Sequence, residues 1–267
     1  MMMECTEIEA ASEVLEKSVI FHVVKEMIGF VLYMHQQIPS VLQDLNLEFD
    51  AMRIERNDLE SGLKQGDEKA STRRKLSGRM RELKQGLRKL EKLMNSISSV
   101  LAALRQMLDE VHGVQVVVLI LGSSPMQPRH VYELSFSQGS VALEREIECT
   151  KNKAAEALSR KIIRALISNG AGSVSYAGPM KLFFLVKAPA SFTLPQHFLP
   201  KREFRYKKKT VPFRLHIKCK VRNQIMENSL QPFQSSTSSE SKSNEIIWFQ
   251  CRHTIKGLAC KSTFSEE

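Results

Sequence analysis

The sequence predicts an α+β domain in which an antiparallel sheet is backed by three helices. Segments with helical periodicity and segments with strand-like composition occur in separate blocks, and the strands follow one another in neighbouring pairs, as in antiparallel sheets. The chain has 267 residues, of which 42% are hydrophobic, so it can bury one substantial core. We therefore expect one domain over residues 12–260, with short tails at 1–11 and 261–267.

Three segments carry apolar residues every three or four positions, which predicts helices. In residues 12–37 the apolar stripe nearly encircles the helix, so we expect this helix at the centre of the domain, ending before Pro39. Residues 79–111 keep one apolar face, and residues 144–168 begin with acidic residues that suit a helix N-terminus. Residues 50–78 are charged and weakly periodic, so we expect a mobile connection with only some helix.

Five segments have the composition or the alternation of strands. Residues 114–122 and 180–188 are almost wholly apolar, which is typical of strands buried on both faces. Residues 130–137 alternate and follow a turn rich in serine and proline, so we expect them to pair with the first segment as a hairpin. Residues 213–222 alternate too, with basic side chains on the wet face, and residues 245–250 form a last, aromatic strand.

The positive charge of the chain is concentrated in one segment. The formal net charge is +10, and residues 201–222 hold ten Lys or Arg and one acid, a net of +9. The remaining 245 residues (267 less these 22) sum to about +1, which argues against a nucleic-acid coat over the whole surface. The five cysteines lack the spacing of zinc ligands, and reduced thiols point to the cytosol or the nucleus.

The sequence contains no pattern that predicts catalysis. It has no dinucleotide or Walker phosphate loop, no zinc-protease motif and no nucleophile elbow. The glycine-rich residues 168–173 follow a helix rather than a strand, so we interpret them as a helix end and turn. No stretch approaches the roughly 18 uncharged apolar residues of a membrane span. We therefore predict a protein that is not an enzyme and that needs no cofactor or metal.

The segment 199–209, LPKREFRYKKK, interleaves basic residues with Phe204 and Tyr206. Four interpretations stay open: a nucleic-acid strip with stacking aromatics, a nuclear-import patch, a contact for an acidic protein surface, or a solvated loop. Because the strip is short, any nucleic-acid binding through it would be weak and steeply dependent on salt.

The last apolar segment follows a serine-rich loop at 227–244 and holds the single tryptophan, Trp248. The free-energy cost of closing such a loop rises only logarithmically with its length, whereas burying a large aromatic ring stabilises a fold by about 3–5 kcal/mol. We therefore expect residues 245–258 to add a strand to the sheet. The strand is either an ordinary last strand or a detachable one that closes a sheet edge where a relative could hold a partner peptide.

Four pieces of the sequence, taken in their order and spacing, resemble one family. They are LYMHQQIP (32–39), VLILGSSPMQPRHVYELSFS (118–137), HFLPK (197–201) and IIWFQCRHTIKG (246–257). Through these pieces the chain resembles the Comet family of HORMA-fold adaptors, which bind the closed form of the mitotic-arrest-deficient checkpoint protein. The resemblance spans roughly residues 20–258.

The resemblance implies a HORMA-like domain locked closed by its own C-terminal strand, with Ile247, Trp248 and Phe249 in the position where a relative traps a partner peptide. It also implies a function: such adaptors bind closed-state HORMA proteins and present them to a hexameric AAA+ remodelling ATPase, which disassembles spindle-checkpoint complexes. HORMA proteins of meiotic chromosome axes are further expected clients. The implied protein is a monomer when free and contacts neither membrane nor nucleic acid. It is expected in the nucleus and cytoplasm, including kinetochores and meiotic chromosomes.

The resemblance further implies two binding surfaces. The client HORMA protein would contact a surface made of Met34, Arg160, Ile163, Arg164 and Ile167. At two of these positions the family pattern differs, with a glutamine in place of Met34 and an aromatic residue in place of Ile163. The ATPase would contact a Pro-Lys pair and the basic run after it, namely Pro200, Lys201, Arg202, Lys207 and Lys208. Two other hypotheses stay open: a nucleic-acid or chromatin-binding protein that uses residues 199–222, and a helical scaffold built on residues 79–111.

Overall fold

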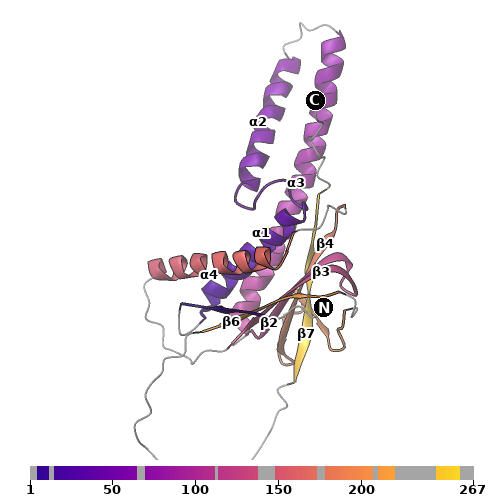
Figure 1. Cartoon of the computed structure of the whole chain (residues 1–267). Coiled ribbons are helices and arrows are strands. Elements are labelled where there is room, and N and C mark those ends of the chain that lie inside the picture. The colour runs from indigo at the N-terminus through magenta and orange to yellow at the C-terminus, as the bar shows by residue number, and fades with distance from the viewer. Residues whose placement is uncertain are drawn as a thin grey trace, which may run out of the picture.

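One seven-stranded sheet forms the centre of the structure, with its strands in the order β1-β6-β3-β2-β4-β7-β5 (Figure 1). The strands are β1 (Thr6–Glu9), β2 (Val116–Ser124), β3 (Gln127–Phe136), β4 (Lys181–Pro189), β5 (Phe198–Lys201), β6 (Phe213–Lys218) and β7 (Ile246–Lys256). This computed structural model describes residues 5–11, 15–64, 70–111, 114–137, 148–172, 178–206, 210–219 and 245–258. The expectations for residues 227–244 and 261–267 lie outside these ranges.

The described part of the chain has four helices, one more than the sequence predicts. They are α1 (Lys17–Met34), α2 (Leu45–Lys64), α3 (Ala70–Glu110) and α4 (Glu148–Ser168). α1, α3 and α4 correspond to the three predicted helices. α4 packs on α1, while α3 contacts α1 and β7 (Figure 1). Within the described ranges, no helix has both the length and the apolar character that crossing a bilayer requires.

The sheet is mixed, which corrects the prediction of an antiparallel sheet. β6 runs parallel to both β1 and β3, and the other neighbouring pairs are antiparallel. A parallel pair needs a long connection, and the chain supplies one because α4, β4 and β5 lie between β3 and β6. The prediction that residues 1–11 are only a tail is wrong for residues 6–9, since β1 joins the sheet and buries Ile8.

The charged segment 50–78, which we expected to be a mobile connection, is helical over residues 50–64 and 70–78. α2 and the first half of α3 pack side by side and extend away from the sheet (Figure 1). Met52 of α2 lies against Gly86 of α3, and Glu55 forms an ion pair with Arg79 at 2.7 Å. Each helix needs only a narrow apolar stripe to meet the other, and this explains the weak periodicity of the segment.

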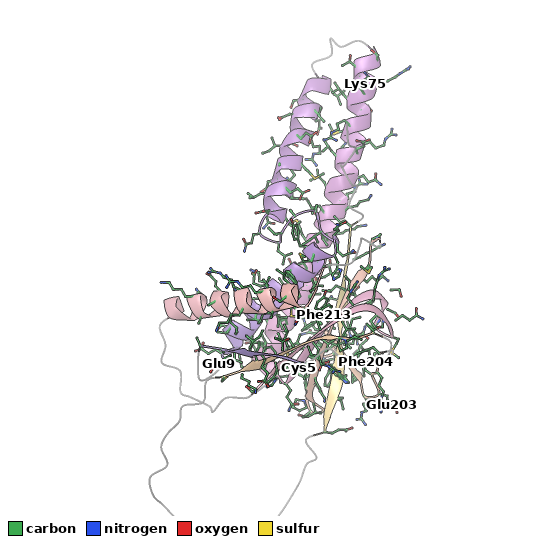
Figure 2. The ribbon with its side chains drawn as sticks, viewed as in Figure 1. Cys5, Glu9, Lys75, Glu203, Phe204 and Phe213 are labelled. Atoms are coloured by element: carbon green, nitrogen blue, oxygen red, sulfur yellow. The ribbon has the colours of Figure 1, made fainter. Side chains whose placement is uncertain are left out.

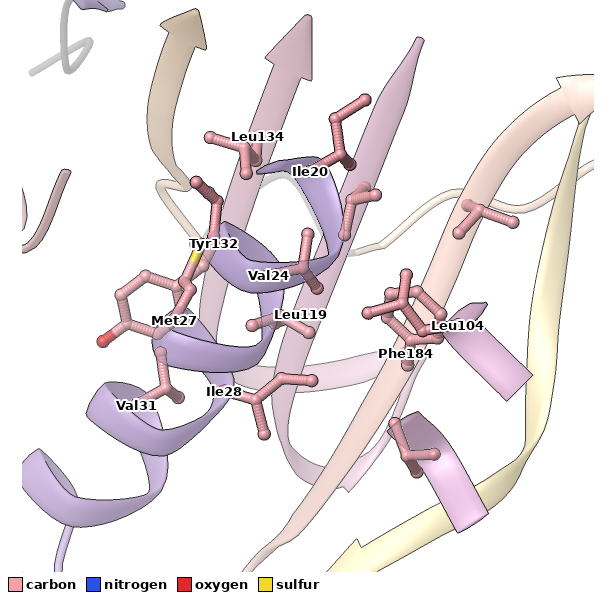
Figure 3. Packing of buried hydrophobic residues seen from close by; sticks show 14 of the residues in the cluster. Ile20, Val24, Met27, Ile28, Val31, Leu104, Leu119, Tyr132, Leu134 and Phe184 are labelled. Carbon is pink, nitrogen blue, oxygen red and sulfur yellow. The ribbon is translucent and has the colours of Figure 1, made fainter. Parts of the chain in front are cut away.

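The main core lies between the helices and one face of the sheet (Figure 3). Val24 and Ile28 of α1 pack with Leu119 of β2, and Leu104 of α3 lies beside Phe184 of β4. All five side chains are fully buried. α1 therefore sits at the centre of the domain, as the wide apolar stripe of its sequence predicts.

A smaller core covers the opposite face of the sheet. Ile120, Val131 and Phe183 form it together with Phe204, which comes from the loop after β5 and is 9% exposed. β2 and β4 are thus covered on both faces, which explains their continuous apolar runs. Because Phe204 packs inward on this face, the interpretation of the basic strip as a row of base-stacking aromatics loses one of its two rings.

Candidate functional site

The outer face of α4 carries the residues that the resemblance assigns to client binding. Ile162 and Leu166 are buried on the inner side of the helix, against α1. Arg160, Ile163, Arg164 and Ile167 lie on the opposite side at steps of three and four residues, so they form one surface. Ile167 is 52% exposed and places an apolar side chain on this outer face.

The end of α1 lies beside the end of α4. Met34 packs against Gly172, which follows α4 and has a φ of +85°, in the left-handed region that favours glycine. Tyr33, next to Met34 in the chain, is 46% exposed. The structure thus brings Met34 to the same surface as the four α4 residues. We call this surface, made of Tyr33, Met34, Arg160, Ile163, Arg164 and Ile167, the α1–α4 surface.

The two arginines of the α1–α4 surface differ in their partners. Arg160 forms an ion pair at 3.0 Å with Glu156, one turn earlier on the same helix. Arg164 has no such pair among the described residues. Arg164 is therefore the cation on this surface that is free to meet an acidic group of a partner. Tyr33, which the sequence reasoning did not assign to this surface, is exposed at the end of α1.

The end of α1 is fastened to β3 by a buried polar cluster. His35 Nε2 and the Tyr132 hydroxyl are 2.6 Å apart, and the rings of His35 and His130 lie 4.0 Å apart. Burial lowers the pKa of His35 to about 4, and the nearby charges of His130 and Arg129 act in the same direction. His35 is therefore neutral at physiological pH. Two of the four pieces that carry the family resemblance meet in this cluster.

Gln37, which follows α1 and is fully buried, links three distant segments. Its side-chain amide donates to the carbonyl of His35 at 2.7 Å, and its side-chain oxygen accepts the backbone N–H of Met180 at 2.6 Å. Its own backbone carbonyl accepts the N–H of Leu258 at 2.8 Å. Gly257 packs so closely on Gln37 that a side chain there would collide with it. Gln37 therefore ties the last described residues of the chain to the end of α1 and the start of β4.

The C-terminal segment forms β7, which lies inside the sheet between β4 and the edge strand β5. β7 pairs antiparallel with β4 on one side and with β5 on the other. Ile247 and Phe249 point into the main core and are 5% and 4% exposed. Trp248 points to the opposite face, where its ring lies 5.9 Å from that of Phe204. The prediction that Trp248 is the buried anchor is therefore only partly met, since Phe249 is the more buried ring.

The cysteine in the middle of β7 is buried, as are Ile247 and Phe249 on the same strand. Cys251 is fully buried and pairs in register with Phe198 of β5. Burial raises the pKa of its thiol to about 11, partly offset by a backbone hydrogen bond at His253. The thiol is therefore protonated and screened from reagents while β7 stays in the sheet.

The residues that the resemblance assigns to ATPase binding lie at the end of β5. Pro200 is opposite Phe249 and Lys201 is opposite Trp248, and the side chains of Pro200, Lys201 and Arg202 are exposed. Proline is tolerated there because β5 is an edge strand. Lys207 and Lys208 lie outside the described residues. The Pro-Lys pair is thus held in place by its pairing with β7.

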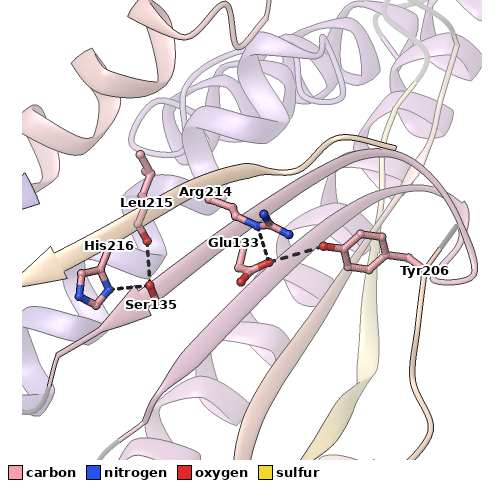
Figure 4. Close-up of polar contacts among 6 residues, drawn as sticks. All are labelled: Glu133, Ser135, Tyr206, Arg214, Leu215 and His216. Atoms are coloured by element: carbon pink, nitrogen blue, oxygen red, sulfur yellow. Dashed lines mark hydrogen bonds and ion pairs between the residues drawn. The ribbon is translucent and has the colours of Figure 1, made fainter. Parts of the chain in front are cut away.

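The second aromatic residue of the basic strip also packs against the protein. Tyr206 is partly buried on the small core, and its hydroxyl lies 3.5 Å from a carboxylate oxygen of Glu133 (Figure 4). The same carboxylate is 3.6 Å from Nε of Arg214. Phe213, the third aromatic residue in the described part of 199–222, stacks on Tyr132 at 5.1 Å between ring centroids. All three rings therefore pack against the protein, which argues against the nucleic-acid hypothesis for residues 199–222.

The described residues contain no group of three or more His, Cys, Asp or Glu placed to hold a metal ion. The fold and its surfaces define an α+β binding protein that is compatible with a HORMA-like domain: helices on one face of a mixed sheet, an exposed apolar and basic helix surface, and a C-terminal strand inside the sheet.

The particular family follows from comparison of the sequence with family models. The model for p31comet, described as "Mad1 and Cdc20-bound-Mad2 binding", matches residues 15–260. The chain therefore belongs to the p31comet family, whose members are adaptor-type binding proteins, and the resemblance found in the four sequence pieces is confirmed. A comparison with curated proteins gave no match.

Proposed function

We propose that this chain is an adaptor that binds Mad2 in its closed state, bound to Mad1 or Cdc20, and presents it to a hexameric AAA+ remodelling ATPase. Membership of the p31comet family supports the first step, since the family is described by binding to Mad2 in these complexes. The observation that carries the proposal furthest is the position of β7 between β4 and β5. The chain fills this part of the sheet with its own residues and so needs no partner peptide there.

The α1–α4 surface is the proposed contact for the client. It combines exposed apolar side chains, Tyr33 and Ile167, with the unpaired cation of Arg164. Exposed aromatic and aliphatic anchors surrounded by polar groups are typical of protein interfaces. Met34 and Ile163 differ from the family pattern, so the contacts of this chain with its client differ in detail from those of other members.

The end of β5 is the proposed contact for the ATPase. Pro200, Lys201 and Arg202 are exposed at a sheet edge, and Lys207 and Lys208 follow in the chain. β5 has β7 as its single strand neighbour. The shape of this contact therefore depends on closure by the C-terminal segment, which makes closure a condition for recruiting the ATPase.

The activity that follows is the disassembly of spindle-checkpoint complexes in mitosis. Remodelling of HORMA proteins on meiotic chromosome axes is the corresponding proposal for meiosis. Both place the chain in the nucleus and cytoplasm, and at kinetochores or meiotic chromosomes when it is engaged with a client. The chain itself supplies no catalysis in this scheme, because ATP hydrolysis belongs to the remodelling enzyme.

Two paired variants test the proposal, and each serves as the control for the other. Binding is measured by calorimetry against Mad2 held closed by a Cdc20 or Mad1 peptide, and against the purified ATPase. Ile163→Glu with Ile167→Glu should weaken Mad2 binding by at least about tenfold and leave ATPase binding unchanged, because charge is placed in an apolar contact. Pro200→Ser with Lys201→Glu should have the opposite pattern.

The outcome that contradicts the proposal is equally clear. Ile167, Pro200 and Lys201 are exposed and Ile163 is only partly buried, so the melting temperatures of both variants should stay close to that of the unmodified chain. If correctly folded variants bind Mad2 and the ATPase as the unmodified chain does, the two surfaces are wrongly assigned. If the unmodified chain fails to bind closed Mad2, the function itself is wrong.

A further inference from the structure

The hairpin formed by α2 and α3 separates charges between its two helices. Residues 70–92 of α3 hold nine Lys or Arg and two Glu, a net charge of +7. α2 holds three Lys or Arg and five Asp or Glu, a net charge of −2. The net charge of the residues outside 201–222 is close to zero because acidic residues elsewhere offset a second basic region. This second basic region lies on one helix, α3.

Six of the α3 cations lie on one side of the helix. Five of them follow one another at steps of three, four and seven residues, and Lys89 is next to Arg88; all lie opposite the side on which Leu83 and Leu87 are buried. We call this row the α3 basic ridge; its members are Arg74, Arg81, Lys84, Arg88, Lys89 and Lys92. All six are exposed, and at 1.5 Å per residue the ridge is about 27 Å long.

The cations of the α3 basic ridge have no acidic partners within the described residues. Arg79, which faces α2, is paired with Glu55 and Glu82, whereas no ridge side chain forms an ion pair there. Lys84 and Arg88 are one helical turn apart, an arrangement of like charges that destabilises an isolated helix. The ridge is therefore an unneutralised line of charge that does not serve the stability of its own helix.

The hairpin presents the ridge away from the rest of the domain. Figure 1 shows α2 and the first half of α3 extending beyond the sheet and α4. Figure 2 shows Lys75 at the outer end of this hairpin, far from Glu203 and Phe204 on the sheet. The half of α3 that carries the ridge is therefore a part of the fold distinct from α4 and from the sheet (Figure 1).

The residue types of the α3 basic ridge favour one kind of negatively charged partner over the others. The cores of protein interfaces are depleted in charge and rich in aromatic anchors, and the ridge has no such anchor. A membrane-bound helix needs exposed apolar residues to insert, and the apolar side of α3 packs against α2. Single strands are held by stacking on aromatic rings, which the ridge also lacks. A duplex needs only cations placed along its phosphates.

We infer that the α3 basic ridge binds the phosphate backbone of a nucleic-acid duplex, independently of sequence. Such a contact adds an anchor to the adaptor, separate from its proposed client and ATPase surfaces. With up to six phosphate contacts, the logarithm of the binding constant should fall with the logarithm of salt concentration at a slope of about −5. The dissociation constant near physiological salt should lie in the range of about 10⁻⁴ to 10⁻⁶ M.

The test is a fluorescence-anisotropy titration of the full chain against a labelled duplex of about 20 base pairs, at salt between about 50 and 200 mM. The ridge variant is Arg81→Gln, Lys84→Gln and Arg88→Gln. It should bind at least about tenfold more weakly and reduce the salt slope by about three. The matched control neutralises three cations of the other basic segment: Lys201→Gln, Arg202→Gln and Arg205→Gln. The control should change the affinity less than about twofold.

Several results would overturn the inference. They are absent binding to the duplex by the unmodified chain, a ridge variant that binds normally, and a control variant that loses as much affinity as the ridge variant. Polyglutamate and vesicles of anionic phospholipid are titrated in parallel, and tighter binding to either than to the duplex would overturn it too. Circular dichroism checks that the ridge variant keeps its helices, which is expected because all three side chains are exposed.

Discussion

β1 and β5 are the two edge strands of the sheet, and each is four residues long with a single strand beside it. β1 is paired with β6, and two side chains add hydrogen bonds, from Lys161 of α4 to the carbonyl of Glu9 and from Asn169, just after α4, to Thr6. β5 is paired with β7, and it contributes Phe198 to a group of aromatic rings with Phe184 and Phe192.

The difference between the two edges lies in what holds the neighbouring strand. β6 lies beside β3, which belongs to the hairpin at the centre of the sheet. β7 is the C-terminal segment, and it separates β5 from β4. Loss of β7 would remove the single strand neighbour of β5, as loss of β6 would remove that of β1. The comparison teaches that the β5 edge depends on the C-terminal segment, whereas the β1 edge depends on a strand that lies earlier in the chain and on the side chains of Lys161 and Asn169.

The largest expected effect comes from removing residues 245–267. The deletion takes out four side chains of the main core, Ile247, Phe249, Cys251 and Ile255, and leaves β4 and β5 without their shared neighbour. Because truncating one large buried side chain costs about 3–5 kcal/mol and whole domains are stable by about 5–15 kcal/mol, the shortened chain should not fold cooperatively. Thermal unfolding followed by circular dichroism measures this. A chain ending after Leu258 is the control and should melt normally; a cooperative, unshifted transition in the longer deletion would contradict the account.

A single substitution in the closing strand should have the next largest effect. The ring of Phe249 is 4% exposed and lies 4.9 Å from that of Phe192, so Phe249→Ala should lower the free energy of unfolding by about 3–5 kcal/mol. Trp248→Ala is the matched variant on the opposite face, where the ring is only partly buried, and its cost should be smaller. Urea denaturation gives both values. If Trp248→Ala cost more than Phe249→Ala, β7 would be held mainly by contacts on the face of the sheet that carries Trp248.

The buried amide that holds the end of the closing strand should have an intermediate effect. Gln37→Ala removes the acceptor of the Met180 N–H and the donor to His35, so the free energy of unfolding should fall by about 1–3 kcal/mol. Hydrogen exchange at the backbone of Gly257 and Leu258 should also become faster, because these residues are tied to the same turn. Gln43→Ala, an exposed glutamine in the following loop, is the control. Unchanged exchange at the end of the chain would show that Gln37 does not secure it.

The smallest effect is expected at the β1 edge. Lys218 donates a hydrogen bond to Glu7 of β1, and its charge helps to lower the pKa of that carboxyl. A depressed folded-state pKa gives stability that is present at neutral pH and is lost as the pH falls through that pKa. Glu7→Gln should therefore melt slightly earlier at pH 7, and the difference should shrink and vanish as the pH falls through the lowered pKa of Glu7. Glu9→Gln is the control, because Glu9 is on the same strand and its carboxylate forms no ion pair among the described residues.

The buried elements were predictable because their sequences are distinctive. β2 and β4 are continuous apolar runs, and α1 has apolar residues on nearly every side. The last strand could be predicted from the return of Trp248 and its apolar neighbours after a polar stretch. The grouping of Arg160, Ile163, Arg164 and Ile167 could also be predicted, because helical spacing alone places them on one side of α4.

The sequence did not predict β1, β5, α2 or the start of α3. These elements are stabilised by contacts with other parts of the fold, and their own sequences lack a clear strand or helix pattern. β1 has the sequence TEIE, in which Ile8 is the one buried residue, and β5 contains Pro200. α2 and the start of α3 are highly charged, and each forms a helix because the other covers its narrow apolar stripe. The links made by Gln37 join residues 143 and 221 positions apart in the chain, from Gln37 to Met180 and Leu258, and no local pattern reports such distances.

The central claim is that the C-terminal segment stays in the sheet, and Cys251 tests it most directly. Its thiol is fully buried in β7, while Cys5 is exposed and serves as an internal reference. The measurement is the rate of alkylation of each cysteine by iodoacetamide in the folded chain, followed by mass spectrometry. The account predicts that Cys5 reacts at the rate of a free thiol and that Cys251 reacts only when denaturant is added. Equal rates for the two thiols under native conditions would contradict closure by the chain's own strand.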